Sequence, residues 1–145
     1  MFIADLHNDV LQRAMIGEDI SKKTDKGHSD LVRLNDSCID LEVFVVWINS
    51  KNLQEGAFKK ANKLYDKLEV LEKENNFIKI TKSVSDIYRA KNNNILSTPI
   101  SIEGGEPIED KIENLYHFIN RGLFYFGPTW NHSLNWVSSG YDEIH

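Results

Sequence analysis

The amino-acid sequence predicts an α/β fold built on a parallel β-sheet, and three features of its patterning support this class. Short apolar segments alternate with longer amphipathic ones, as in a strand–helix–strand fold. The segment from Val43 to Ile48 is apolar without a break, as expected for a strand covered on both faces. In residues 54–75, apolar side chains recur every three or four positions, which is helical spacing. We therefore expect four main strands, at about residues 2–7, 39–48, 98–103 and 123–130.

The first half of the chain carries two predicted short helices between its strands. After the first strand, residues 10–16 have the pattern of a helix that Gly17 ends. Residues 18–29 are polar and lack periodicity, which indicates a surface loop. Asp30 follows this loop and has the side chain expected of a helix N-cap.

The second half repeats the alternation of strands and helices. Ser83 with Asp86 resembles a capping box at the start of a helix. Pro99 lies at the start of the third strand, where its missing N–H group is tolerated. Pro107 opens a further helix that Gly122 ends, with an expected core-facing stripe of Ile108, Ile112, Leu115 and Ile119.

The composition is that of one ordinary globular domain. The chain has 145 residues, 41% of them hydrophobic and 27% charged, which allows one hydrophobic core. The net charge of −5 argues against a nucleic-acid binder held by phosphate contacts. No segment has the roughly 20 apolar residues of a membrane span or the pattern of a signal peptide. Cys38 is the single cysteine, which excludes an intrachain disulfide and a thiolate-rich zinc site and favours a reducing cytoplasm.

Polar side chains follow three of the predicted strands. His7 and Asp9 flank Asn8 at the end of the first strand, Glu103 ends the third, and His132 follows the fourth. Because the carboxyl ends of parallel strands share one face, we expect these side chains to gather there. Alone, Glu103 is equally well explained as a turn carboxylate and His132 as an exposed loop residue. Together they form the ligand set of a hydrolytic zinc or manganese site.

Two further features bear on this site. The glycines Gly104 and Gly105 allow a sharp turn after Glu103, and they lack the spacing of a dinucleotide or phosphate-binding loop. The three tryptophans that are candidates for lining a pocket are Trp47, Trp130 and Trp136.

Four short motifs occur in a fixed order along the chain. They are Asp5–Asp9, then residues 28–31 with Arg33, then Ile102–Gly105, and then Thr129–His132 with Asn135. In order and approximate spacing they resemble the membrane dipeptidase (renal dipeptidase-like) family of zinc peptidases, family M19. The resemblance covers essentially the whole chain.

The resemblance implies a (β/α)8 barrel of the amidohydrolase type with two zinc ions, which hydrolyses dipeptides through a metal-activated water. It assigns His7 and Asp9 to one metal and Glu103 to the position that bridges both metals. It assigns His132 to contact with the substrate, where it helps to polarise the scissile carbonyl. It identifies no general acid or base in this chain.

Family members are well over twice this length, and two histidines from later strands hold their second metal. We therefore expect residues 1–145 to be the N-terminal part of a single dipeptidase-like barrel domain, with about four of eight βα units and one zinc at most. A truncated dipeptidase and a non-catalytic, metal-binding or associating half-barrel both fit this expectation, as does another barrel metallohydrolase such as a phosphoesterase. The open sheet edges suit a complementary C-terminal half or a second copy of the chain.

Overall fold

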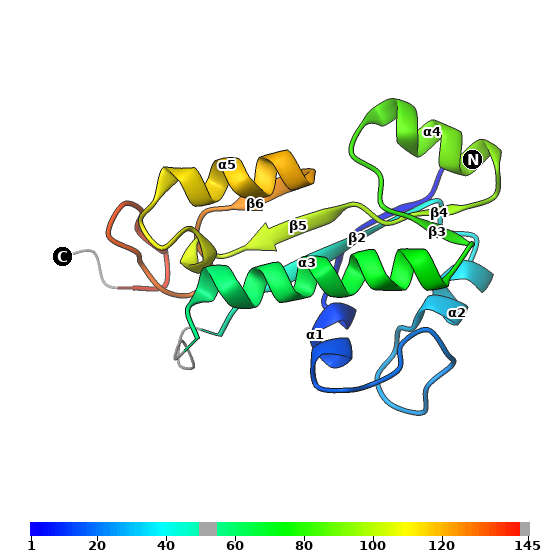
Figure 1. Ribbon diagram of the computed structural model, residues 1–145, viewed down its shortest axis with the longest axis horizontal. Helices are drawn as coiled ribbons and strands as arrows, with labels where there is room; N and C mark the ends of the chain where they lie inside the picture. The colour runs from blue at the N-terminus through cyan, green and yellow to red at the C-terminus, as the bar shows by residue number, and fades with distance from the viewer. Residues whose placement is uncertain (50–54, 143–145) are drawn as a thin grey trace.

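A parallel sheet forms the centre of the molecule, which is described here by a computed structural model at residues 1–49 and 55–142 (Figure 1). Strand β2 lies in the middle of the sheet, with β1 on one side and β4 and β5 on the other; β5 pairs with β6, and β3 pairs with β4. Each of these pairings is parallel, which confirms the predicted class. The strands span Ala4–Asn8 (β1), Leu41–Trp47 (β2), Ile78–Lys79 (β3), Leu96–Ser97 (β4), Ile100–Glu103 (β5) and Leu123–Gly127 (β6).

Helices alternate with the strands, and α3 runs along the length of the sheet on its outer face (Figure 1). The core between sheet and helices includes Phe44 and Val46 of β2, Leu68 of α3 and Phe118 of α5, all of them buried. The α-helices span Val10–Met15 (α1), Leu31–Asp36 (α2), Ala57–Glu74 (α3), Val84–Asn92 (α4) and Ile112–Arg121 (α5), and a 3-10 turn spans Glu106–Ile108 (η1).

The opposite face of the sheet is concave and carries a second, smaller cluster. Leu41, Val43 and Val45 of β2 are buried there with Ile87 of α4, and Tyr125 of β6 packs against them. The hydroxyl group of Tyr125 reaches β1, although β2 and β5 separate these two strands within the sheet. The sheet is therefore strongly curved, as in part of a barrel.

Local sequence signals explain where several helices begin. The carboxylate of Asp30 accepts a hydrogen bond of 2.8 Å from the backbone N–H of Arg33 and so caps α2. The hydroxyl of Ser83 accepts one of 3.1 Å from the N–H of Asp86 and caps α4. Both predicted caps are confirmed. The predicted start of α3 at Gln54 lies outside the described residues.

Two predicted elements differ from the structure in the second half of the chain. The third strand is divided into β4 and β5, because Pro99 cannot donate to a neighbouring strand. The helix predicted from Pro107 onward is also divided, since Glu109 and Asp110 adopt left-handed backbone conformations between η1 and α5.

This break changes which face of α5 meets the core. The predicted stripe assumed one continuous helix. Ile108 is buried and Leu115 packs against the core, as predicted, but Ile112 and Ile119 are about half exposed, and Phe118 is fully buried in their place. No helix in residues 1–49 and 55–142 combines the length and apolar character needed to cross a membrane.

Candidate metal centre

Three of the predicted ligands converge at the carboxyl ends of the strands. His7 lies near the end of β1, Asp9 directly follows that strand, and Glu103 is the last residue of β5. The imidazole Nε2 of His7 lies 3.7 Å from Asp9 Oδ2 and 3.7 Å from Glu103 Oε2. One nitrogen or oxygen atom from each side chain falls within 4.8 Å of the other two.

The side chain of Asp9 remains available to this cluster. Asp9 occupies the N-cap position of α1, where a carboxylate usually bonds the first turn of the helix. Here it makes no capping hydrogen bond, and its side chain is 59% exposed. Its carboxylate is therefore free to face His7.

A bulge in β1 directs His7 toward the site. Asp5 stands opposite Glu42 and Asn8 opposite Phe44, so two residues of β1, Leu6 and His7, occupy the space of one residue in β2. Such a bulge bends a strand and re-aims its side chains. In a regular strand, residues two apart point to the same face; here a bulge followed by a turn brings His7 and Asp9 together instead.

Asn8 holds the turn between the two ligands. Its side-chain amide donates hydrogen bonds of 2.9 Å to the hydroxyl of Ser29 and 2.5 Å to Oε1 of Glu42. Its side-chain oxygen accepts one of 2.9 Å from the N–H of Val10. The peptide chain between His7 and Asp9 is thus fixed on both sides.

Sequence reasoning missed Glu42, although the sequence carries a signal for it. Glu42 is a charged residue within the apolar run of β2, and the fold buries it completely. Burial raises the pKa of Glu42 to about 7; the hydrogen bond from Asn8 opposes this shift, and the charge of Asp5 adds to it. Its second oxygen, Oε2, is buried without a hydrogen-bond partner, in agreement with a carboxyl group that favours its proton.

The acidic groups of the cluster repel one another. Burial raises the pKa of Glu103, the positive charge of His7 opposes this shift, and the negative charge of Asp9 adds to it. A cation between these side chains would relieve the repulsion between Asp9 and Glu103.

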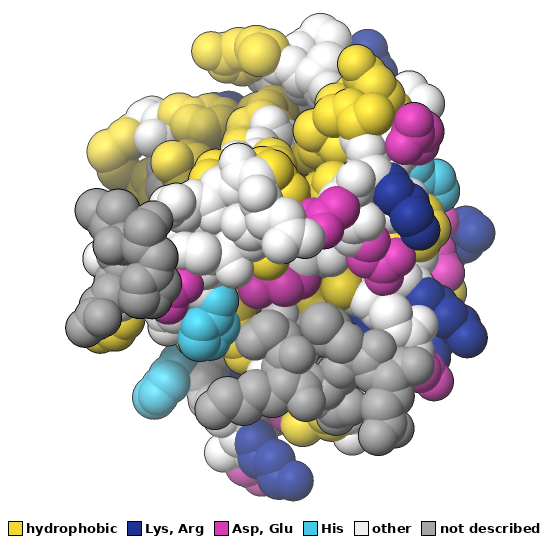
Figure 2. All heavy atoms as spheres, turned by 90° about the vertical axis from the view of Figure 1, so that its left-hand side faces the viewer, with side chains coloured by type: hydrophobic (Ala, Val, Ile, Leu, Met, Phe, Trp, Pro, Cys, Tyr) yellow, Lys and Arg dark blue, Asp and Glu magenta, His cyan; other side chains and the backbone are white. Residues whose placement is uncertain are grey.

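The cluster fits a divalent metal ion in chemistry and in spacing. Imidazole and carboxylate are ligands of zinc, which binds them at about 2.0–2.2 Å, so that tetrahedral ligand atoms lie roughly 3.4 Å apart. The two distances of 3.7 Å from His7 are close to this value. The side chain of His7 is 45% exposed, which leaves room for a water or substrate ligand. Figure 2 looks onto the end toward which the strands point, where acidic and histidine side chains reach the surface.

His132 does not join this cluster. It is exposed and lines a neighbouring cavity of about 400 Å³ together with Trp47 and Trp130, whose ring centroids are 4.9 Å apart. Because Trp47 pairs with Glu103 in the sheet, the cavity adjoins the cluster. Trp136 lies elsewhere and stacks on Phe126.

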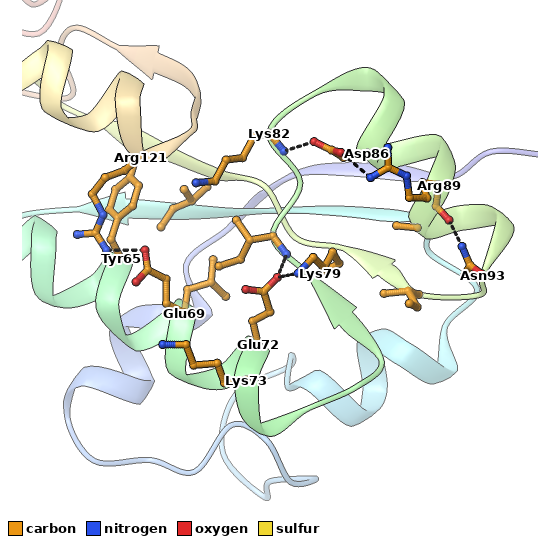
Figure 3. A pocket seen from close by; sticks show the side chains of 15 residues that line it. Tyr65, Glu69, Glu72, Lys73, Lys79, Lys82, Asp86, Arg89, Asn93 and Arg121 are labelled. Carbon is orange, nitrogen blue, oxygen red and sulfur yellow. Dashed lines mark hydrogen bonds and ion pairs between the residues drawn. The ribbon is translucent and has the colours of Figure 1, made fainter.

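Another cavity, of about 540 Å³, opens between α3, α4 and the end of α5 (Figure 3). Basic and acidic side chains line it, and several of them are paired with one another: Arg121 with Glu69, Lys79 with Glu72 and Arg89 with Asp86. None of the cluster residues lines this cavity.

A curved parallel α/β sheet with a His/Asp/Glu cluster at its carboxyl ends defines the class of barrel metallohydrolases. Within this class, the chain belongs to the membrane dipeptidase family, peptidase family M19, whose family model matches residues 1–145. Comparison with curated proteins gives no significant match.

Solved structures share the fold. A metallopeptidase of family M19, described as dipeptidase AC, is 22% identical with a TM-score of 0.81, and the match covers 90% of this chain and 43% of that one. A metallopeptidase from Rhodobacter sphaeroides, bound to a phosphinate mimic of the dipeptide L-Ala-D-Ala, is 20% identical with a TM-score of 0.81 over 90% of this chain and 46% of that one. The probable dipeptidase PvdM from Pseudomonas aeruginosa is 17% identical with a TM-score of 0.76, and the match covers 90% of this chain and 35% of that one.

These likenesses confirm the predicted fold class, a partial (β/α)8 barrel with parallel strands and alternating helices. The chain spans less than half the length of the solved metallopeptidases that it matches.

Proposed function

We propose that residues 1–145 are the N-terminal part of a single dipeptidase-like barrel domain, and that they carry the first metal site of a zinc-dependent dipeptidase. The observation that supports this most strongly is the convergence of His7, Asp9 and Glu103 within 4.8 Å in a chain of family M19. In this proposal His7 and Asp9 hold one zinc ion, and Glu103 occupies the position that bridges to a second. A bound zinc ion would supply a water molecule with a pKa lowered toward neutrality.

The residues around the cluster have distinct roles in this proposal. Asn8 and Glu42 orient the ligands, as their hydrogen bonds indicate. His132 contacts a dipeptide in the cavity beside the cluster, where Trp47 and Trp130 supply apolar walls. The single cysteine supports a reducing compartment such as the cytoplasm.

An alternative proposal is a half-barrel that binds metal or associates without turnover. It is supported by the edge strands β1 and β6, each of which pairs with one neighbour among the described residues. Leu6 and Phe124 on these edges are 58% and 41% exposed. Such edges suit a complementary C-terminal half or a second copy of the chain.

A single series of measurements separates the two proposals. The purified chain is titrated with Zn²⁺ by calorimetry and then assayed for hydrolysis of L-Ala-L-Ala and L-Ala-D-Ala, beside the variants Glu103→Gln and Glu74→Gln. Glu74 is an exposed carboxylate at the end of α3 and serves as the matched control.

Turnover that Glu103→Gln abolishes and Glu74→Gln preserves supports the dipeptidase. Binding of one ion without turnover supports the half-barrel proposal. A chain that binds no zinc contradicts the metal site in both.

A further inference from the structure

The peptide group between Leu6 and His7 is held by side chains from two directions. It lies in the bulge, where the register between β1 and β2 is interrupted. On one side, the N–H of His7 donates a hydrogen bond of 3.0 Å to Oδ1 of Asp5. On the other side, the carbonyl oxygen of Leu6 accepts one of 2.6 Å from the hydroxyl of Tyr125.

Tyr125 reaches this peptide group across the concave face of the sheet. It belongs to β6, which β2 and β5 separate from β1. Its ring packs against the buried cluster of Leu41, Val43, Val45 and Ile87. Its backbone N–H donates a hydrogen bond of 3.3 Å to the hydroxyl of Ser101 in β5. A ring fixed in this way presents its hydroxyl group at a defined point.

The negative charges of the cluster also act on the hydroxyl of Tyr125. Burial raises the pKa of Tyr125; an interaction with Ser101 opposes this shift, and the charges of Glu103, Asp9 and Asp5 add to it. The group therefore remains a protonated donor at neutral pH, as the bond to the Leu6 carbonyl requires.

We propose that Tyr125 is a positioning residue of the metal centre, which fixes the peptide ahead of His7 and so sets the imidazole of His7 against Glu103. The inference rests on the proposed metal site. His7 is in β1 and Glu103 in β5, so the distance between them depends on the curvature of the sheet. The bond from Tyr125 to Leu6 ties the far strand β6 to β1 and holds that curvature.

The variant Tyr125→Phe tests this role, because it keeps the ring in place and removes only the hydroxyl group. Tyr116→Phe is the matched control, since Tyr116 lies on α5 with 59% of its surface exposed. The full chain and both variants are titrated with Co²⁺, followed by its visible absorption, and with Zn²⁺ in competition with a chromophoric chelator. Urea unfolding of the metal-free proteins is measured in parallel.

Tyr125→Phe is expected to weaken Zn²⁺ binding by about 3- to 10-fold, as for one lost hydrogen bond behind a ligand, and to change the Co²⁺ spectrum. Tyr116→Phe is expected to match the wild type in Zn²⁺ affinity and in the Co²⁺ spectrum. The proposal is overturned if Tyr125→Phe binds Zn²⁺ with unchanged affinity and spectrum while only its unfolding shifts, because Tyr125 is then a packing residue. If the wild-type chain takes up neither ion, the proposed metal site itself fails, and the assignment of Tyr125 fails with it.

Discussion

The side-chain amide of Asn8 donates a hydrogen bond of 2.5 Å to the carboxyl group of Glu42, which is fully buried in β2. Asn8 is the residue between His7 and Asp9, so this contact connects the proposed ligands to the interior of the sheet. The pKa of about 7 at Glu42 means that the contact involves a neutral carboxyl below that pH and a buried charge above it.

The stability of the chain should depend on pH through Glu42. The pKa rises from about 4.5 in the unfolded chain to about 7 in the folded one, so folding favours the protonated form. The contribution of protonated Glu42 to the free energy of unfolding is complete below about pH 4.5 and is lost as the pH rises through about 7. The loss is on the order of 3 kcal/mol. Glu42→Gln keeps the acceptor for Asn8 but cannot ionise. In urea unfolding of the metal-free proteins, the free energy of unfolding of the variant should rise relative to that of the wild type between pH 4.5 and 8. A difference between the two proteins that does not change with pH would refute the raised pKa of Glu42.

Asn8→Ala should destabilise the chain, because it removes the partner of a buried carboxyl. We expect a loss of about 2 kcal/mol in the free energy of unfolding. A double-mutant cycle with Glu42→Ala, which removes the acceptor, isolates the contribution of the pair, and contacting residues of this kind are coupled by about 0.5–3 kcal/mol. Additive effects of the two substitutions would show that the hydrogen bond between Asn8 and Glu42 contributes nothing.

Gly105 should tolerate no side chain. A Cβ atom at this position would come within 2.7 Å of the carbonyl oxygen of Pro128 and within 2.6 Å of Trp136 and Leu134. Backbone cannot yield easily, so Gly105→Ala should lower the free energy of unfolding by about 1–3 kcal/mol. A Cβ atom at Gly140 would meet no other atom within 4 Å, so Gly140→Ala is the control, expected to change stability by less than about 0.5 kcal/mol. An equal loss of stability in Gly105→Ala and Gly140→Ala would contradict the close packing around Gly105.

Phe118 should contribute more to stability than its neighbour Ile119. Phe118 is completely buried among α3 and α5 side chains, whereas Ile119 is 49% exposed. Truncation of a buried phenylalanine to alanine costs about 3–5 kcal/mol, while most surface changes stay within about 0.5 kcal/mol. Chemical denaturation of Phe118→Ala and Ile119→Ala measures this difference. A larger loss for Ile119→Ala would restore the continuous stripe predicted from the sequence.

The sequence predicted the parallel sheet, the caps at Asp30 and Ser83, and the residues that converge near the strand ends, because these depend on local patterns. It placed Ile108 and Leu115 in the core correctly but Ile112 and Ile119 wrongly, since left-handed backbone at Glu109 and Asp110 interrupts the helix and no local pattern marks that break. It could not reveal Tyr125, whose hydroxyl meets a peptide group 119 residues away in the chain.

Zn²⁺ calorimetry on the chain and on three single variants tests whether His7, Asp9 and Glu103 hold a divalent ion. We predict one ion per wild-type chain, with affinity lowered at least tenfold in His7→Ala, Asp9→Asn and Glu103→Gln and unchanged in the control Glu74→Gln. Equal affinity in all five proteins, or no binding by the wild type, would contradict it.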